Sequence, residues 1–198
     1  MSNTNELSST LIDAALAASQ RGDSARALAL LDQASQIHPS SGIPHFLMAA
    51  EFASLGQVEQ AELSFSNAVL LEPGMAIARY QLGLLQYSSG RPAAALVTWQ
   101  PLLDQGEASP FPHWARGFGA LAQDQFEVAR KHFETGVQLN KVNPPMSSDI
   151  LKILAEIDAV QRRNLGAHSQ PSPSAIMDEA DASSHFLVSN YERQGTVH

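Results

Sequence analysis

The chain carries a pattern of side-chain sizes that recurs every 34 residues. Small residues recur in two columns, which are Ala15, Ala49, Gly83, Gly117 and Ala27, Ala61, Ala95, Ala129. Large apolar residues form a third column at Leu31, Phe65, Trp99 and Phe133. A fourth column of turn-formers lies midway through each repeat, where a left-handed backbone costs glycine little: Gly22, Gly56, Gly90 and Asp124. Because apolar residues follow helical spacing around these columns, the period predicts a stack of helix pairs.

The columns resemble the tetratricopeptide repeat family, in which small residues stand at places eight and twenty, an aromatic at place twenty-four and a proline near the end. The second repeat matches this pattern best, through Ala49, Phe52, Gly56, Ala61, Phe65, Ala68 and Pro73. The resemblance covers residues 8–141. It implies an all-α, right-handed α-solenoid of four helix pairs, at about 8–41, 42–75, 76–109 and 110–143, with a C-terminal capping helix.

The segments around the repeats have their own signatures. Residues 1–7 are expected to be a flexible N-terminus. Serines at 147 and 148 precede an apolar stripe, which predicts a capping helix over 147–163. Residues 164–185 are rich in Ser, Pro, Ala and acidic residues, which predicts a disordered linker. Residues 186–198 form a short apolar and aromatic tail motif, with Phe186, Leu187, Val188 and Tyr191. In the third and fourth repeats the helix stops are expected at Pro110, Pro112, Pro144 and Pro145.

Composition excludes several kinds of function. The chain has no cysteine, which removes disulfide frameworks, thiolate metal sites and cysteine nucleophiles. Its net charge of −8, with only 12 Lys and Arg, argues against nucleic acid or an anionic membrane as partner. No apolar run is long enough to span a membrane, and the start lacks the order of a signal peptide, so a cytoplasmic location is expected. Catalytic motifs, metal-ligand spacing and cofactor-binding loops are not evident, so we expect neither enzyme activity nor a cofactor.

The resemblance implies that the first helix of each repeat lines a concave groove through places two, five, nine, twelve and thirteen. None of these places holds a charged residue. The large groups expected to form the groove are Ile12, Ile43, Phe46, Ile77, Tyr80, Leu84, Tyr87, Phe111, Trp114, Phe118 and Leu121. Arg79 and Arg116 are expected at the rim. Family members that hold the acidic tails of heat-shock chaperones use Lys and Asn in the groove, and those places are apolar here. An apolar or amphipathic peptide is therefore the expected ligand. The alternative is that the aromatic stripe is core.

Three functions are compatible with such a groove. The first is an adaptor or scaffold that binds a protein segment. The second is a dedicated chaperone for secreted or membrane-inserting clients, similar to the small acidic repeat chaperones of bacterial type III secretion. The third is a regulatory or recruiting subunit of an enzyme complex. The tail motif could return to the groove or be presented to another protein, and the first repeat could self-associate through the face that contains Leu11 and Ile12.

Overall fold

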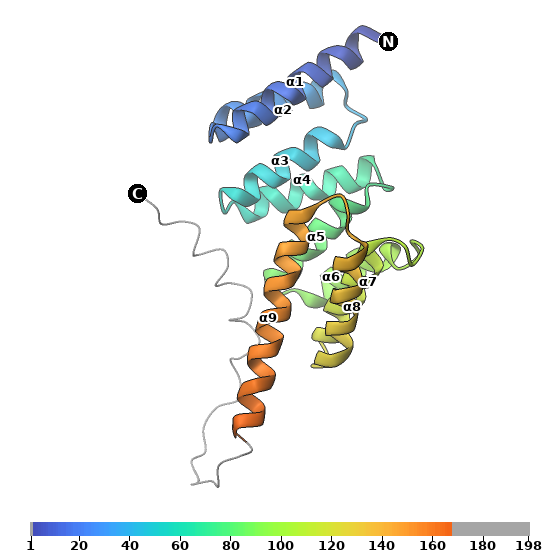
Figure 1. The fold of residues 1–198 in the computed structure, drawn as a ribbon. Coiled ribbons are helices and arrows are strands. Elements are labelled where there is room, and N and C mark those ends of the chain that lie inside the picture. Colours follow the sequence, from blue (N-terminus) through green and yellow to red (C-terminus); the bar gives the residue numbers. More distant parts are fainter. Residues whose placement is uncertain (1, 168–198) are drawn as a thin grey trace. The chain divides into compact units, whose positions relative to one another are not determined.

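A computed structural model describes the backbone of residues 2–167 and the side chains of residues 6–163. In this part of the chain every regular element is helical (Figure 1). Contacts divide the chain into an N-terminal unit, residues 1–98, and a C-terminal unit, residues 99–198. The predicted all-α fold of paired helices is confirmed. The elements are α1 Ser2–Gln20, α2 Ser24–Ile37, α3 Ile43–Ser54, α4 Val58–Leu71, α5 Ala76–Ser88, α6 Pro92–Trp99, η1 Gln100–Leu102, α7 Pro110–Leu121, α8 Phe126–Leu139 and α9 Pro144–Ala167.

The N-terminal unit is built from the helix pairs that the period predicts. Helix α1 packs against α2 and α3 packs against α4, and further contacts join α2 to α3 and α4 to α5. The small residues of the repeat, such as Ala15, Ala49 and Ala61, are fully buried where helices approach closely. Around them lie larger apolar groups, with Phe65 4% exposed and Leu31 3% exposed. In the core, helices therefore cross closely at the small residues, and Leu and Phe side chains fill the space between these crossings.

Each turn between paired helices uses a left-handed residue. Gly22, Gly56 and Gly90 have φ of 77°, 70° and 73°, and Asp124 has φ of 57°. A residue with a Cβ atom loses roughly 1–2 kcal/mol in this conformation, and Asp is one of the few that tolerates it. Gly42 lies in the connection between two helix pairs, just before α3, and is needed for a different reason. A Cβ atom there would lie 2.8 Å from the Ala68 carbonyl oxygen, so the close approach to α4 requires glycine.

In the C-terminal unit, α7 packs against α8 and α8 against α9. Buried side chains at helical spacing on α9 face the unit's interior, namely Ile150, Ile153, Leu154 and Ile157. Arg130 on α8 forms an ion pair with Asp158 and donates to the Gln161 amide oxygen at 2.8 Å, which fixes α9 beside α8.

Several boundaries differ from the predicted ones. Helix α1 begins at Ser2, so residues 2–7 are helical; no Pro or Gly interrupts them. Helix α9 spans Pro144–Ala167, longer than 147–163, and takes in the first four residues of the predicted linker. The remaining linker and the tail motif lie outside the described residues.

The late prolines begin helices. Pro110 is the first residue of α7 and Pro144 the first of α9, because a missing N–H and a fixed φ suit the first helical position. The break in the third repeat comes from Pro101. It lies in the 3₁₀ turn directly after α6 ends at Trp99, since proline cannot continue an α-helical hydrogen-bond ladder.

Candidate functional site

Helices α1 and α3 are the first helices of the two pairs in the upper part of Figure 1, and a hydrogen bond joins them. The Ser19 hydroxyl donates to the Glu51 carboxylate at 2.7 Å, and this bond ties the two helices together near their C-terminal ends. Glu51 is only 8% exposed. Its side chain is therefore engaged between the helices and does not stand as a free charge on the surface beside them.

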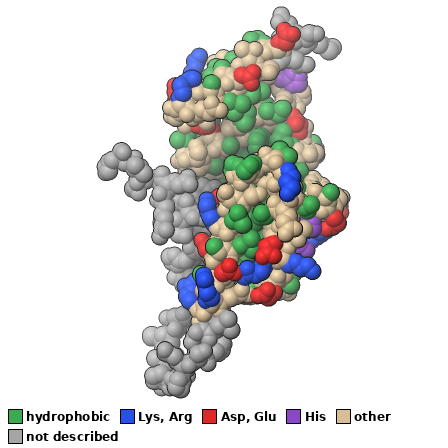
Figure 2. Space-filling view, in the orientation of Figure 1, with side chains coloured by type: hydrophobic (Ala, Val, Ile, Leu, Met, Phe, Trp, Pro, Cys, Tyr) green, Lys and Arg blue, Asp and Glu red, His purple; other side chains and the backbone are tan. Residues whose placement is uncertain are grey.

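The surface of these two helices keeps apolar side chains accessible. Leu16 is 42% exposed and Ile43 is 44% exposed, whereas Ile12 and Phe46 are half-buried. Ile12 and Leu16 are four residues apart on α1, and Ile43, Phe46 and Ala50 follow the same helical spacing on α3. We call these five residues the α1–α3 face. In Figure 2, hydrophobic side chains lie along the middle of the part that contains α1–α4, with most charged groups toward its edges.

Phe46 connects this face to the core beneath it. Its ring lies 5.9 Å from the ring of Phe65 on α4, at 53°. The aromatic contact fixes the side chain, so that only part of the ring remains accessible. The α1–α3 face is therefore a preformed apolar surface with two exposed aliphatic groups on a rigid base.

On α5 the predicted groove residues are more deeply placed. Ile77, Leu84 and Tyr87 are half-buried, and Tyr80 is 2% exposed. Tyr80 therefore cannot contact a ligand in this conformation, and its prediction as a groove residue is wrong in that respect.

The same correction applies with greater force to the C-terminal unit, where Trp114 and Phe118 are fully buried. The Phe118 ring stacks on Trp99 at 5.1 Å and meets the edge of Phe133 at 5.0 Å. The Trp114 indole occupies the space that a Cβ atom of Gly136 would need. These rings fill the core of their own repeat. Phe111, whose ring is 5.9 Å from Trp114, and Leu121 are half-buried.

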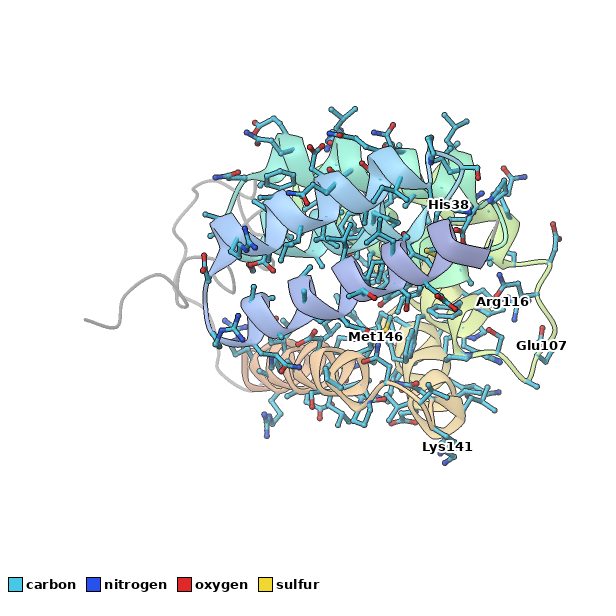
Figure 3. The ribbon with its side chains drawn as sticks, turned by 90° about the horizontal axis from the view of Figure 1, so that it is seen from above. His38, Glu107, Arg116, Lys141 and Met146 are labelled. Carbon is cyan, nitrogen blue, oxygen red and sulfur yellow. The ribbon has the colours of Figure 1, made fainter. Side chains whose placement is uncertain are left out.

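The predicted rim arginines also differ from each other. Arg116 forms an ion pair at 2.9 Å with Glu107, which lies in the loop before α7 (Figure 3). The Arg116 guanidinium is therefore already paired with a carboxylate of the C-terminal unit. Arg79 is half-buried on α5.

A pair of histidines lies beside that arginine. The His113 Nε2 atom is 3.1 Å from the Glu107 carbonyl oxygen, and the His113 ring is 6.0 Å from that of His132. Burial, then Arg116, then His113 lower the pKa of His132. Within residues 6–163 no three His, Asp or Glu side chains are grouped so that they would hold a metal ion. None of the described helices combines the length and apolarity needed to cross a membrane.

Sequence reasoning missed some exposed apolar groups. Leu16 has a groove place but was not among the large groups expected there. On the outer side of α4, Leu63 is 64% exposed and Leu70 is 76% exposed. The signal for this second surface is their spacing of seven residues, which puts two leucines on one side of a helix.

Known proteins share this architecture. Residues 46–109 match the family model described as tetratricopeptide repeat. A curated relative, the small glutamine-rich tetratricopeptide repeat-containing protein 2 of Saccharomyces cerevisiae, is 27% identical over 135 residues, which cover 68% of this chain and 35% of that protein. The chain thus spans little more than a third of this relative.

Solved structures agree on the fold. PilF of Pseudomonas aeruginosa superposes with a TM-score of 0.61 at 21% identity, covering 86% of this chain and 80% of PilF. YrrB, described as a tetratricopeptide repeat protein with an unusual peptide-binding site, gives a TM-score of 0.55 at 18% identity, covering 77% and 76%. The family match thus identifies tetratricopeptide repeats at residues 46–109, and the likeness to these solved structures shows that the described chain shares the fold of such repeats.

Proposed function

We propose that this chain is a non-catalytic adaptor that holds an apolar or amphipathic segment of another protein on the α1–α3 face. Tetratricopeptide repeats serve as protein-interaction modules, and YrrB, which has a similar fold, is described as having a peptide-binding site. The observation that carries the proposal is the exposure of Leu16 and Ile43 on a surface whose groove places contain no charged residue. An uncharged surface of this kind favours an apolar partner over an acidic tail.

The size of the surface sets the expected affinity. Leu16 and Ile43 each keep roughly 80 Å² accessible, and covering both contributes roughly 4 kcal/mol before the entropy of binding is subtracted. Two such anchors alone would bind weakly. An amphipathic helix that also covers Ile12, Phe46 and Ala50 would present its own side chains at intervals of three, four and seven residues. We therefore expect a dissociation constant on the order of micromolar rather than nanomolar.

The proposal is tested with a defined probe. The probe is a fluorescein-labelled 18-residue peptide of Leu, Ala and Gln, with leucines spaced to form one apolar helical stripe. A shuffled peptide of the same composition, in which the leucines form no stripe, is the reference. Fluorescence anisotropy measures binding to the full chain. We expect the patterned peptide to bind at least tenfold more tightly than the shuffled one.

Two variants place the binding on the proposed face. L16E and I43E each introduce a carboxylate that the probe would have to bury, so each should weaken binding at least tenfold. L55E is the matched control, because Leu55 is 46% exposed and lies in the α3–α4 turn outside the face. Circular dichroism verifies that all three fold. Equal binding by L16E, I43E and the parent chain would refute the proposal, and so would equal binding of the two peptides.

A further inference from the structure

The outer side of α4 carries a short apolar stripe. Leu63 and Leu70 are 64% and 76% exposed, and Ser66 lies between them on the same side of the helix. We call these three residues the outer stripe. Val97 on α6, 34 residues after Leu63, is 71% exposed and repeats the apolar character at the equivalent place. In the fourth repeat this place holds Lys131, so the apolar surface belongs to the N-terminal unit.

Two polar side chains at the outer stripe, Ser66 and Glu62, have partners within the chain. The Ser66 hydroxyl donates to the Glu62 carbonyl oxygen at 2.8 Å. The Glu62 carboxylate accepts two hydrogen bonds from Arg91, at 3.0 and 2.6 Å, and one from Gln86 at 3.3 Å. Because these groups are already bonded, covering the stripe with an apolar surface would not strand a hydroxyl or a charge.

We infer that the outer stripe binds a second copy of this chain, with α4 antiparallel to the α4 of its partner across a two-fold axis near Ser66. The arrangement of the stripe is self-complementary. A two-fold axis midway between Leu63 and Leu70 places Leu63 of each copy against Leu70 of the other, and the small Ser66 lets the helices cross closely. A single segment thus supplies both halves of the contact.

Although the chain is acidic, the antiparallel arrangement keeps the acidic side chain beside the stripe away from its own copy. Glu59 lies on the same side of α4 as the stripe, and the antiparallel arrangement places it opposite position 74 of the partner. The two copies of Glu59 are then roughly 22 Å apart along the helix axis, at about 1.5 Å per residue. This separation exceeds the screening length of about 8 Å at physiological salt, so they do not repel appreciably.

The exposed area indicates the strength of the dimer. Leu63, Leu70 and Val97 together keep roughly 400 Å² accessible, so two copies bury about 1,000 Å² when the polar margin is included, which is the lower limit for specific interfaces. The ion pair between Arg91 and Glu62 places the start of α6 beside α4, and Val97 follows on α6 at the place equivalent to Leu63. We expect a dimer with a dissociation constant on the order of tens of micromolar.

Sedimentation equilibrium on the full chain, from about 1 to 500 µM, tests the dimer. The parent chain should pass from monomer to dimer over this range. L63E and L70K should each remain monomeric, because each would bury two unpaired charges against leucine. L7E is the matched control, since Leu7 is 51% exposed on α1, and it should dimerise like the parent. A monomeric parent chain at 500 µM, or a dimeric L63E, would overturn the inference.

A mixture of variants tests the register. When L63E is combined with L70K, the new carboxylate at position 63 meets the new ammonium at position 70, and the other contact remains Leu against Leu. The mixture should therefore form a heterodimer although neither variant dimerises alone. Failure of the mixture to associate would overturn the two-fold arrangement.

The absence of cysteine allows an independent measurement. S66C introduces a single thiol beside the proposed axis, and diamide oxidation should cross-link it rapidly to its copy. S40C places a thiol on the exposed turn after α2 and should cross-link at least tenfold more slowly. Equal rates for the two variants would count against the two-fold contact at Ser66.

Discussion

The two units use the same places of the repeat in opposite ways. At places five and nine, the first two repeats of the N-terminal unit carry Ile12, Leu16, Phe46 and Ala50, which are exposed or half-buried. At the same places in the fourth repeat, Trp114 and Phe118 are sealed inside the C-terminal unit. A residue's place in the repeat therefore does not decide whether it is available to a partner.

The difference follows from which other residues are small. In the C-terminal unit Gly117 and Gly136 leave hollows in the backbone surface. The hollows are occupied by aromatic rings, since a Cβ atom on Gly117 would lie 2.6 Å from the Phe133 ring. The second repeat has Ala49 and Ala68 at these places, and their Cβ atoms fill the space. Glycine at these places lets the aromatic rings of Trp114 and Phe133 enter the core, whereas alanine at the same places accompanies a Phe46 that is only half-buried.

The largest effect expected from this comparison is on stability. Phe118→Ala should destabilise the C-terminal unit by about 3–5 kcal/mol, because it leaves a cavity between Trp99 and Phe133. Leu16→Ala, at the equivalent place, should cost about 0.5 kcal/mol or less. Both tryptophans of the chain, Trp99 and Trp114, lie in the C-terminal unit, so tryptophan fluorescence during urea unfolding reports on that unit alone. Similar losses for the two variants would contradict the contrast.

The second prediction concerns the glycine itself. Gly117→Ala should destabilise the C-terminal unit by about 1–3 kcal/mol, although alanine favours a helix, because the new methyl group meets the Phe133 ring. The combination of Gly117→Ala with Phe133→Leu should recover part of the loss, since it removes the ring that clashes. Tryptophan fluorescence again measures the transition. A Gly117→Ala chain as stable as the parent would show that the fit between glycine and ring is unimportant.

The repeat columns predicted the helix pairs well, because they record a geometric requirement that each pair must meet. Gly22, Gly56, Gly90 and Asp124 have positive φ, and the small residues such as Ala61 and Ala129 are fully buried. Boundaries were less predictable. A proline such as Pro110 can end one helix or begin the next, and only the contacts of neighbouring residues decide between them.

The candidate site was predictable only in part. The lack of charged residues at the groove places was visible in the sequence, and so was the apolar character of Ile43 and Phe46. The sequence could not show that Trp114 turns toward Gly136, because the two residues are 22 positions apart and each has a separate, plausible function. Large aromatic side chains are often predicted to bind ligands, yet their size also suits them to fill the space that a glycine leaves beside a helix backbone.

The third prediction examines electrostatics in the N-terminal unit. The hydrogen bond from Arg91 lowers the pKa of Glu62, so the pair adds stability that is present above the ordinary value of about 4.5 and is lost as the pH falls through the lowered pKa. Arg91→Ala should cost roughly 0.5–1 kcal/mol at pH 7, a modest loss because both side chains are partly exposed. The difference from the parent chain should shrink toward pH 3 in thermal melts followed by circular dichroism. A difference that is constant with pH would mean that the loss comes from packing alone.

The smallest expected effect is a dependence on pH in the C-terminal unit. Burial lowers the pKa of His132, with Arg116, His113 and Lys131 acting in the same direction and Glu107 opposing them. The unfolded chain therefore binds a proton more readily than the folded one, and stability should fall as the pH drops below about 6.5. His132→Gln removes this titration while keeping a polar side chain of similar size. Urea unfolding followed by tryptophan fluorescence at pH 7.5 and 5.5 should show a smaller loss of stability for the variant than for the parent. An equal loss in both would assign the dependence to groups other than His132.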